Sequence, residues 1–309
     1  MEGNSFFFGW EISLIETLQN LLPEGLLHFI TYLSAFGEEF VMIAVIGYLY
    51  WCRDKETGKK AGLAVLMAAC LNPLVKNIFL RRRPYFESER IKLLRKIEAD
   101  ADTYDIKAQG FSFPSGHSTN AAAVFGILAR IYKPKVFKVL AVVLPIIVAF
   151  SRVVAGAHFP TDVMVGLLMG YLSVFIVPFM VDKIKNKIIL YGIFIVVTVP
   201  GIFFCTSDDY FTTLGLLIGF IMADAFENRF VDFKPAEGLP ESVVRIAGGT
   251  VVYLVLNTLL KLPFSKEFLG DGSFASHMVR TGRYLIIIFA AIALYPMLFK
   301  FIHFKKKNK

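Results

Sequence analysis

Long apolar runs separated by short polar segments make up most of this chain. Each run is close to the length that crosses a bilayer as an α-helix, roughly 20 residues. The pattern predicts nine membrane spans, at 38–52, 59–80, 117–133, 137–153, 160–182, 188–206, 211–228, 242–261 and 281–302. We therefore expect an all-α fold, a polytopic integral membrane bundle of about nine spans.

The apolar segment at 10–36, before the first predicted span, differs from the others. Polar and helix-breaking residues interrupt it: Glu11, Glu16, Pro23, Glu24 and His28. This pattern favours an amphipathic helix that lies in the membrane interface. The segment also lacks the basic start and small-residue cleavage site of a signal peptide, so we expect the mature chain to keep it.

Composition supports the membrane assignment. The chain is 56% hydrophobic and only 19% charged, with a mean hydropathy of +0.59, whereas soluble domains carry about 25% charged residues. Three cysteines lie in or beside apolar runs without metal-ligand spacing: Cys52, Cys70 and Cys205. We expect them to be buried and unpaired by disulfides.

The net charge of +8 could indicate a nucleic-acid partner, but the basic residues gather in short loops between the spans. With nine spans, the basic segments fall on one membrane face: 53–60, 130–138, 182–187 and 300–309. The positive-inside rule makes that face cytoplasmic. The loops on the opposite, extracytoplasmic face are 81–116, 153–160 and 261–280, and the first of these mixes basic with acidic residues.

No internal repeat, low-complexity tract or linker divides the chain into soluble domains. Every candidate functional residue lies before residue 187. We therefore predict a core domain at 1–187 and additional membrane spans of unassigned role at 188–309.

The first candidate group is the stretch KNIFLRRRP, with Lys76 inside a span and Arg83 and Pro84 just after it. A separation of seven residues is about two helical turns, so both cations would share one face and form an anion site. Taken alone, a lysine that reaches the interface beside an arginine cluster would also explain the pattern.

The second group, in FSFPSGHSTN, is Pro114, Ser115, Gly116 and His117 at the start of an apolar run. Serine is a good helix N-cap and glycine leaves its N–H uncovered, so this helix start could bind a phosphate. A capping serine followed by a chance histidine is the simpler interpretation of this group by itself.

The third group, in SRVVAGAHFPTD, contains Arg152, His158 and Asp162, with Pro160 at the predicted helix start. Asp162 in the first turn could accept a hydrogen bond from one nitrogen of His158 and leave the other free as a nucleophile. A plain helix cap and an interfacial histidine are the alternative.

Together the three groups resemble the three-part signature of the type 2 phosphatidic acid phosphatase superfamily. The matching positions are Lys76-x6-Arg83-Pro84, Pro114-Ser115-Gly116-His117 and Ser151-Arg152-x5-His158-x3-Asp162. The motifs cover 76–162, and the span pattern extends the likeness over roughly 38–182.

The resemblance implies a role for each residue. It implies that His158 attacks phosphorus to form a phosphohistidine, that Asp162 orients His158 and that His117 protonates the leaving alkoxide. The phosphoryl oxygens would be held by five residues: Lys76, Arg83, Ser115, Gly116 and Arg152. No metal and no other cofactor is implied, since cations and N–H groups supply the electrostatic stabilisation.

A site at helix ends, walled by Phe-rich spans, favours a lipid phosphate monoester or an isoprenoid diphosphate as substrate. Glucose-6-phosphatases and the soluble vanadium-dependent haloperoxidases share the superfamily, so the fold alone does not decide the chemistry. A phosphotransferase and a non-catalytic protein that binds or transports lipid headgroups remain alternatives.

We expect lipid as the partner and no nucleic acid, with the oligomeric state unassigned. In a bacterium the location would be the plasma membrane with an extracytoplasmic site, and in a eukaryote the endoplasmic reticulum is open.

Two features depart from the family pattern. The family core commonly has six spans, whereas this chain continues with further spans after about residue 190. This extension and the stretch at 37–62 are similar to the sphingosine-phosphate phosphatase branch, although we assign no sphingoid substrate. The insert at 85–105 is long; it could be a gating surface helix, but a solvated insert without function is preferred.

Overall fold

The computed structural model of the chain describes residues 3–96 and 100–301. Within these ranges the regular secondary structure is helical, apart from one isolated bridge between Asn4 and Arg81. The helices are α1 Gly9–Leu21, α2 Glu24–Tyr32, α3 Glu39–Tyr48, α4 Lys55–Phe79, α5 Pro84–Glu87, α6 Ile106–Gln109, α7 Gly116–Ile131, α8 Lys135–Val154, α9 Pro160–Lys183, α10 Lys187–Thr198, α11 Asp208–Phe230, α12 Leu239–Leu259, α13 Lys266–Gly270 and α14 Phe274–Phe289. Short 3-10 or π turns extend several of them: η1 Leu33–Gly37, η2 Leu49–Arg53, η3 Val199–Phe203, η4 Ala290–Leu294 and η5 Tyr295–Phe301.

Among the described residues, seven helical segments are long and apolar enough to cross a membrane. They are Glu24–Arg53, Lys55–Phe79, Lys135–Val154, Pro160–Lys183, Asp208–Phe230, Leu239–Leu259 and Phe274–Phe301. The chain is therefore an all-helical integral membrane protein, as predicted.

The predicted count of nine spans is not confirmed. The expected span at 117–133 is the 16-residue helix α7, which is about 24 Å long at about 1.5 Å per residue and so falls short of a hydrocarbon core of roughly 30 Å. The expected span at 188–206 is the shorter apolar segment Lys187–Phe203. The first candidate span, Glu24–Arg53, also takes in part of the segment expected to lie in the interface.

The chain divides into two compact units. Unit 1 consists of Met1–Met42 and Leu71–Val177, and unit 2 consists of Ile43–Cys70 and Pro178–Lys309. All the predicted site residues lie in unit 1. The predicted domain boundary at 187/188 stays a prediction.

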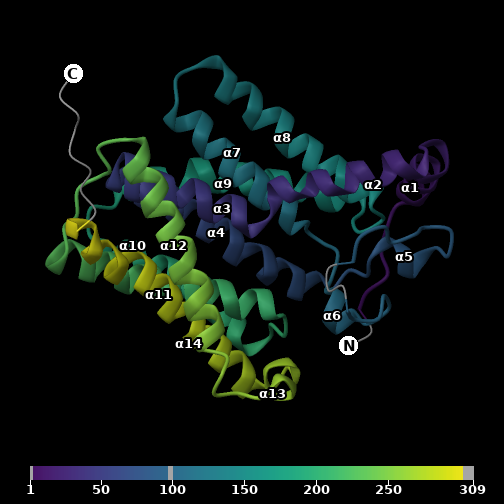
Figure 1. The fold of residues 1–309 in the computed structure, drawn as a ribbon. Helices are drawn as coiled ribbons and strands as arrows, with labels where there is room; N and C mark the ends of the chain where they lie inside the picture. Colours follow the sequence, from purple (N-terminus) through teal and green to yellow (C-terminus); the bar gives the residue numbers. More distant parts are fainter. Residues whose placement is uncertain (1–2, 97–99, 302–309) are drawn as a thin grey trace. The chain divides into compact units, whose positions relative to one another are not determined.

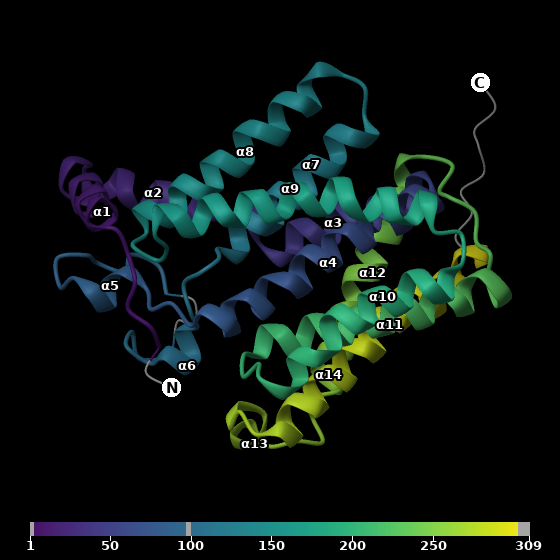
Figure 2. The same cartoon turned by 180° about the vertical axis from the view of Figure 1, so that it is seen from behind.

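In unit 1, α7, α8 and α9 run side by side (Figure 1, Figure 2). Two glycines of α9, four residues apart, let its backbone approach α7. A Cβ on Gly166 would lie 2.6 Å from the Ser115 carbonyl oxygen, and one on Gly170 would lie 2.3 Å from that of Thr119. Small residues at this spacing allow close helix packing in membranes, and here they bring the starts of α7 and α9 together.

The N-terminal segment packs over the same end of unit 1. The Asn4 N–H donates to the Leu80 carbonyl at 2.7 Å, and the Asn4 carbonyl accepts from the Arg82 N–H at 2.9 Å. A buried apolar cluster then joins four parts of the chain: α1, the segment that follows α4, the end of α8 and the start of α9. Its members are Ile15, Tyr85, Ile91, Ala149, Val153, Phe159 and Val163.

The insert at 85–105 is more ordered than the preferred solvated interpretation. Its residues 88–96 are not helical, but the Gln19 amide donates to the carbonyls of Lys92 and Val154, both at 2.9 Å. The Leu94 N–H donates to the Ala155 carbonyl at 3.0 Å. These bonds hold the segment against the end of α8. Residues 97–99 of the insert and residues 302–309 of the basic tail lie outside the described residues.

In unit 2, α11 packs along α14, with Gly215 and Gly219 at their closest approach. A buried ion network joins Lys59 to Asp224 at 2.8 Å and to Glu227 at 3.0 Å. Cys52, Cys70 and Cys205 are all free and buried, which confirms the prediction for them.

Candidate active site

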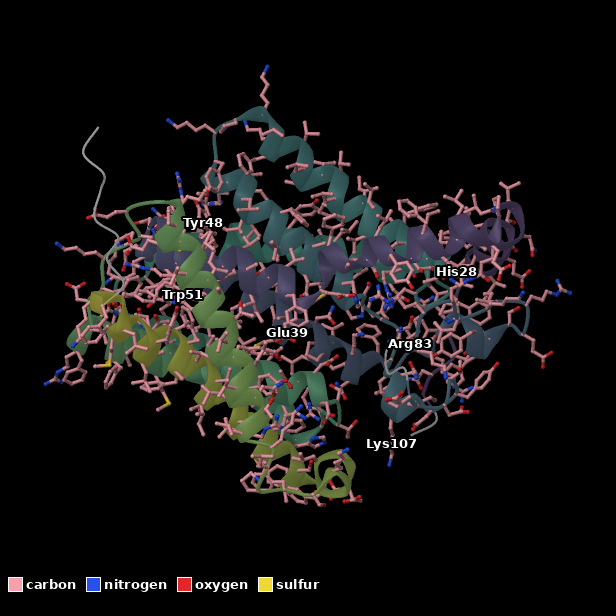
Figure 3. The ribbon with its side chains drawn as sticks, in the orientation of Figure 1. His28, Glu39, Tyr48, Trp51, Arg83 and Lys107 are labelled. Carbon is pink, nitrogen blue, oxygen red and sulfur yellow. The ribbon has the colours of Figure 1, made fainter. Side chains whose placement is uncertain are left out.

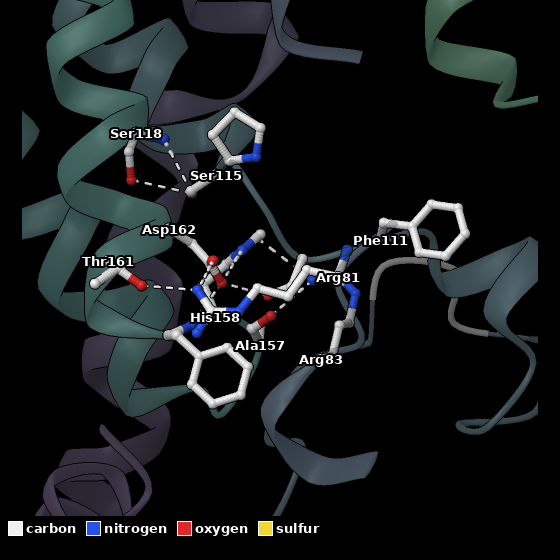
Figure 4. Close-up of polar contacts among 12 residues, drawn as sticks. Arg81, Arg83, Phe111, Ser115, Ser118, Ala157, His158, Thr161 and Asp162 are labelled. Carbon is white, nitrogen blue, oxygen red and sulfur yellow. Dashed lines mark hydrogen bonds and ion pairs between the residues drawn. The ribbon is translucent and has the colours of Figure 1, made fainter. Parts of the chain in front are cut away.

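The three predicted motifs meet at one end of unit 1. Lys76 lies in the last turn of α4, and Arg83 caps α5. Ser115 caps α7, Arg152 lies in the last turn of α8, and Asp162 lies in the first turn of α9. Figure 3 shows Arg83 among crowded side chains and Figure 4 shows its neighbours in close-up, whereas Lys107 on α6 is exposed.

His158 lies in the turn between α8 and α9 and is 1% exposed. Its Nε2 is 3.4 Å from Nη1 of Arg83, and its Nδ1 is 3.6 Å from Oδ2 of Asp162. Because a guanidinium only donates hydrogen bonds, the Nε2 that faces it carries a lone pair, and the ring proton belongs on Nδ1, towards Asp162. Nε2 is therefore the nitrogen available to attack an electrophile.

The electrostatics of this turn keep the imidazole neutral. Burial, followed by the charges of Arg83, Lys76 and Arg152, lowers the pKa of His158 well below its usual value. A histidine with such a pKa is unprotonated at neutral pH, as a nucleophile must be. The sequence predicts a hydrogen bond from His158 to Asp162. The distance of 3.6 Å between Nδ1 and Oδ2 is too long for that bond in this structure.

Asp162 is fully buried and is held by donors on both oxygens. Its Oδ1 accepts from Nη1 of Arg81 at 2.6 Å. Its Oδ2 accepts from the Phe159 N–H at 2.7 Å and from the hydroxyl of Ser112. These bonds fix the carboxylate beside the turn that carries His158 (Figure 4).

Arg81 was not predicted as a site residue, although it lies in the first motif segment. It is 2% exposed, and its guanidinium carbon lies 4.0 Å from the ring centre of Phe159 and 5.0 Å from that of Phe6. Its Nη2 donates to Oε2 of Glu11 at 2.8 Å. One guanidinium thus bridges Asp162 and a carboxylate from the N-terminal helix.

Glu11 was noted only as a polar interruption of the first apolar segment. It is fully buried, and its Oε1 accepts from the N–H of Thr161 at 3.1 Å and from its hydroxyl at 2.7 Å. The signal that could have identified it is an acid within an apolar segment, since a buried carboxylate requires a cation or several donors.

Arg152 is the residue best suited to bind an anion. It is 1% exposed, yet its Nε and Nη2 have no hydrogen-bond partner. A buried guanidinium with unmet donors is unfavourable unless an anion fills the place that they face. Arg152 lies near His158, since its carbonyl accepts from the His158 N–H at 3.3 Å.

The other predicted cations are held by backbone carbonyls. Nε of Arg83 donates to Gln109 and Gly110, and its Nη1 donates to Ala157 at 2.8 Å. Nζ of Lys76 donates to Phe111 at 3.1 Å, and Lys76 is 9% exposed. The carbonyls orient both side chains at the site.

The start of α7 has the predicted cap. Oγ of Ser115 accepts from the N–H of Ser118 at 3.4 Å and from its hydroxyl at 3.0 Å. A Cβ on Gly116 would meet only the Asn72 side chain, at 3.6 Å. His117 is less buried than His158, but burial, followed by the charges of Arg152, His158 and Lys76, lowers its pKa well below the usual value. This helix start therefore offers N–H groups and an accessible imidazole beside the cations.

Arg95, from the insert, is a further cation that the sequence did not single out. Its Nη2 lies 2.6 Å from Oε1 of Glu38, and its Nη1 donates to the Ser34 hydroxyl at 2.8 Å. Its charge acts on His117 and on Arg152. The insert thus contributes to the field at the site.

The arrangement as a whole suits a phosphate group. Cations and a helix start surround a neutral imidazole whose nucleophilic nitrogen is defined by its neighbours. Among the residues that the structure describes, no group of three or more His, Cys, Asp or Glu could hold a metal ion. The donors at this site attract anions rather than metal cations.

Comparison with known proteins points the same way. The profile of the PAP2 superfamily matches residues 58–186. The profile described as the transmembrane extension of the PAP2 superfamily phosphatases matches residues 211–307. No solved structure matches the chain.

Three curated relatives are similar over about half of this chain. Phosphatidylglycerophosphatase B of Bacillus subtilis is 31% identical over 167 residues, which are 51% of this chain and 74% of the relative. Undecaprenyl-diphosphatase of Sulfolobus acidocaldarius is 26% identical over 52% of this chain and 74% of its own length. Decaprenylphosphoryl-5-phosphoribose phosphatase of Mycobacterium tuberculosis is 28% identical, over 52% of this chain and 84% of its own length.

Proposed function

Because this chain belongs to the PAP2 superfamily, we propose that it is a membrane phosphatase that hydrolyses a lipid phosphate through a phosphohistidine on His158. The observation that carries the proposal is the setting of this one side chain. Nε2 of His158 lies 3.4 Å from Arg83, and Nδ1 faces Asp162. A neutral imidazole with that tautomer, next to cations, is poised to attack phosphorus.

In the proposed first step, Nε2 of His158 forms a bond to phosphorus as the bond from phosphorus to the leaving alkoxide breaks. His117, protonated when the negatively charged phosphate is bound beside it, donates its proton to the alkoxide. Water then breaks the P–N bond, gives up a proton to His117 and releases inorganic phosphate. The positive charge that develops on His158 is balanced by Asp162 through Nδ1–H.

Five groups would hold the phosphoryl oxygens through both steps. The unmet donors of Arg152 are the strongest support, because this buried guanidinium has no acceptor for Nε or Nη2. The others are Lys76, Arg83, the Ser115 hydroxyl and the backbone at Gly116. Such preorganised donors provide most of the stabilisation in phosphoryl transfer, and the mechanism requires no metal ion.

A lipid phosphate monoester or an isoprenoid diphosphate fits the location best. The site lies at the ends of candidate membrane spans, so a phosphate in the headgroup layer could reach it while its tail stays in lipid. The relatives are named for lipid phosphate substrates. In the predicted nine-span arrangement, which counts α7 and Lys187–Phe203 as spans, the basic loops favour an extracytoplasmic site in the plasma membrane if the source is bacterial.

Two alternative functions would use the same phosphate-binding residues. A phosphotransferase would pass the phosphoryl group from His158 to an acceptor other than water. A non-catalytic headgroup-binding or transport protein would need the cations but not His117, His158 and Asp162 together. The presence of this whole set favours the enzyme.

Phosphate release by detergent-purified protein in the presence of EDTA tests the proposal. The substrates are phosphatidic acid, phosphatidylglycerophosphate, undecaprenyl diphosphate, sphingosine phosphate and glucose 6-phosphate. We expect release from at least one lipid substrate, insensitive to EDTA and abolished by His158→Ala, with unchanged thermal unfolding. Full activity in folded His158→Ala protein would overturn the mechanism, and transfer to an added alcohol without phosphate release would identify a phosphotransferase.

A further inference from the structure

Unit 2 contains a cavity of about 360 Å³ at the turn between α12 and α14. Its walls come from the end of α12, from α13 and from the first turns of α14. The lining residues are Lys261, Lys266, Leu269, Gly270, Arg280, Arg283 and Tyr284. Figure 1 and Figure 2 show α13 together with the first turns of α14 at one end of the unit. The volume lies in the range of ligand pockets, roughly 300–1,000 Å³.

The charge of this cavity is strongly positive. Two lysines and two arginines line it, and none of its lining residues is acidic. Three carboxylates lie close by: Asp208 accepts from Nη2 of Arg280 at 2.6 Å and lies 3.5 Å from Nδ1 of His277, while Glu267 and Asp271 directly follow lining residues in the sequence. Nε of Arg280 has no partner. The lining itself therefore contributes only positive charge, and Asp208 pairs with one of its four cations.

Arg283 places a buried cation in the wall of the cavity, in addition to the exposed lysines at its rim. The side chain is 4% exposed. Its Nη2 donates to Oδ1 of Asn257 at 3.0 Å, while its Nε has no hydrogen-bond partner. A neutral amide orients this guanidinium without balancing its charge, so the part of the chain that the structure describes supplies no counter-anion to this buried cation.

We propose that this cavity is a second phosphate-binding site, made entirely by unit 2. Arg280 and Arg283 would donate to phosphate oxygens from the inner wall, and Lys261 and Lys266 would add charge at the mouth. A multiply charged, multiply accepting group fits four cations better than a single carboxylate does. None of these residues belongs to the candidate active site, so the proposal does not rest on the proposed function.

The position of the cavity defines two sources of phosphate. The candidate spans Leu239–Leu259 and Phe274–Phe301 end and begin on either side of it, so it lies where lipid headgroups meet the helix ends. The phosphate of an anionic lipid or free inorganic phosphate could therefore reach it. The chemistry of the site is the same for both.

Native mass spectrometry of the full-length protein in detergent tests the proposal by counting bound phosphate groups. One arm uses inorganic phosphate and the other uses phosphatidic acid, with phosphatidylcholine as the uncharged-headgroup comparison. Because the candidate active site is also proposed to bind phosphate, we expect two equivalents on the natural protein. Lys261→Gln/Lys266→Gln changes two exposed residues and should leave one equivalent, with at least tenfold weaker binding of the other.

Two further variants separate the sites. Lys185→Gln/Lys234→Gln removes the same charge from exposed positions elsewhere in unit 2 and should keep both equivalents. Arg152→Gln should lose the active-site equivalent and keep the one that Lys261→Gln/Lys266→Gln loses. Loss in both arms supports a general phosphate site, and loss with phosphatidic acid alone supports a headgroup site. Two equivalents on Lys261→Gln/Lys266→Gln in both arms, or equal loss in the control variant, would overturn the proposal.

Discussion

Arg81 donates Nη1 to Oδ1 of Asp162 at 2.6 Å while its Nη2 donates to Oε2 of Glu11 at 2.8 Å. All three side chains are buried. The N-terminal helix is therefore tied to the carboxylate that faces His158. In a buried network of this kind, removal of one partner leaves the others uncompensated.

The first prediction concerns this network. Arg81→Met should lower the free energy of unfolding by about 3–5 kcal/mol, because it leaves two carboxylates buried without their cation. Addition of Glu11→Gln should recover part of the loss, with a coupling of about 0.5–3 kcal/mol between the two positions. Thermal unfolding and phosphate release of both single variants and the double variant measure this. Strictly additive effects would show that Glu11 and Arg81 do not act together.

A second prediction concerns the orienting carboxylate. Asp162→Asn should lower kcat by about 10⁴-fold, as in other catalytic triads that lose their carboxylate, with little change in KM. The amide no longer balances the charge that forms on His158. Steady-state kinetics against the most active lipid substrate measure this, and His158→Ala should be more severe. A rise in KM at constant kcat would instead place Asp162 in substrate binding.

The pH dependence follows from the lowered pKa of His158, which burial causes first and the nearby cations second. His158 acts unprotonated, so activity should persist as the pH falls through 6.5 and be lost only below the lowered pKa. The profile of kcat/KM reports this group in the free enzyme. Arg83→Gln removes one of the cations and should move the acidic limb to higher pH. An acidic limb at or above pH 6.5 in the natural protein would contradict the assignment.

The insert should influence turnover through Arg95, whose charge acts on His117 and Arg152. Arg95→Gln should lower kcat/KM by about tenfold, equivalent to about 1.4 kcal/mol. Arg90→Gln is the matched control, because the Arg90 side chain is 83% exposed and its ion pair with Glu16 is long, with 3.8 Å between Nη1 and Oε2. Equal kcat/KM values for Arg95→Gln and Arg90→Gln would show that the charge of Arg95 does not influence turnover.

Membrane sidedness can be measured with introduced cysteines. Lys107 and Lys185 are exposed and lie in segments that the nine-span prediction assigns to opposite faces, while the natural cysteines are buried and should react little. A membrane-impermeant maleimide added to intact cells should label Lys107→Cys. Lys185→Cys should be labelled only after permeabilisation. The reverse pattern would place the candidate site on the cytoplasmic face.

The motif residues could be located from sequence because their spacing is local. Ser115 caps α7 as predicted, and His158 and Asp162 lie at the α8–α9 connection, where four residues of chain keep them close. Apolar runs likewise identified membrane helices, since bilayer thickness sets their length. The exact number of spans did not follow, because α7 is apolar yet only 16 residues long.

The sequence by itself determined the helical membrane class, the family and the three motifs, since each depends on residue type and short spacing. Only the tertiary structure decided that Glu11 reaches Arg81, which is 70 residues away, and that Arg95 lies beside Glu38, 57 residues away. It also decided that Arg283 is buried with an unmet donor. Hydropathy measures whether a side chain prefers water or an apolar environment. The partner of a buried charge depends instead on which distant segments the packed helices bring together.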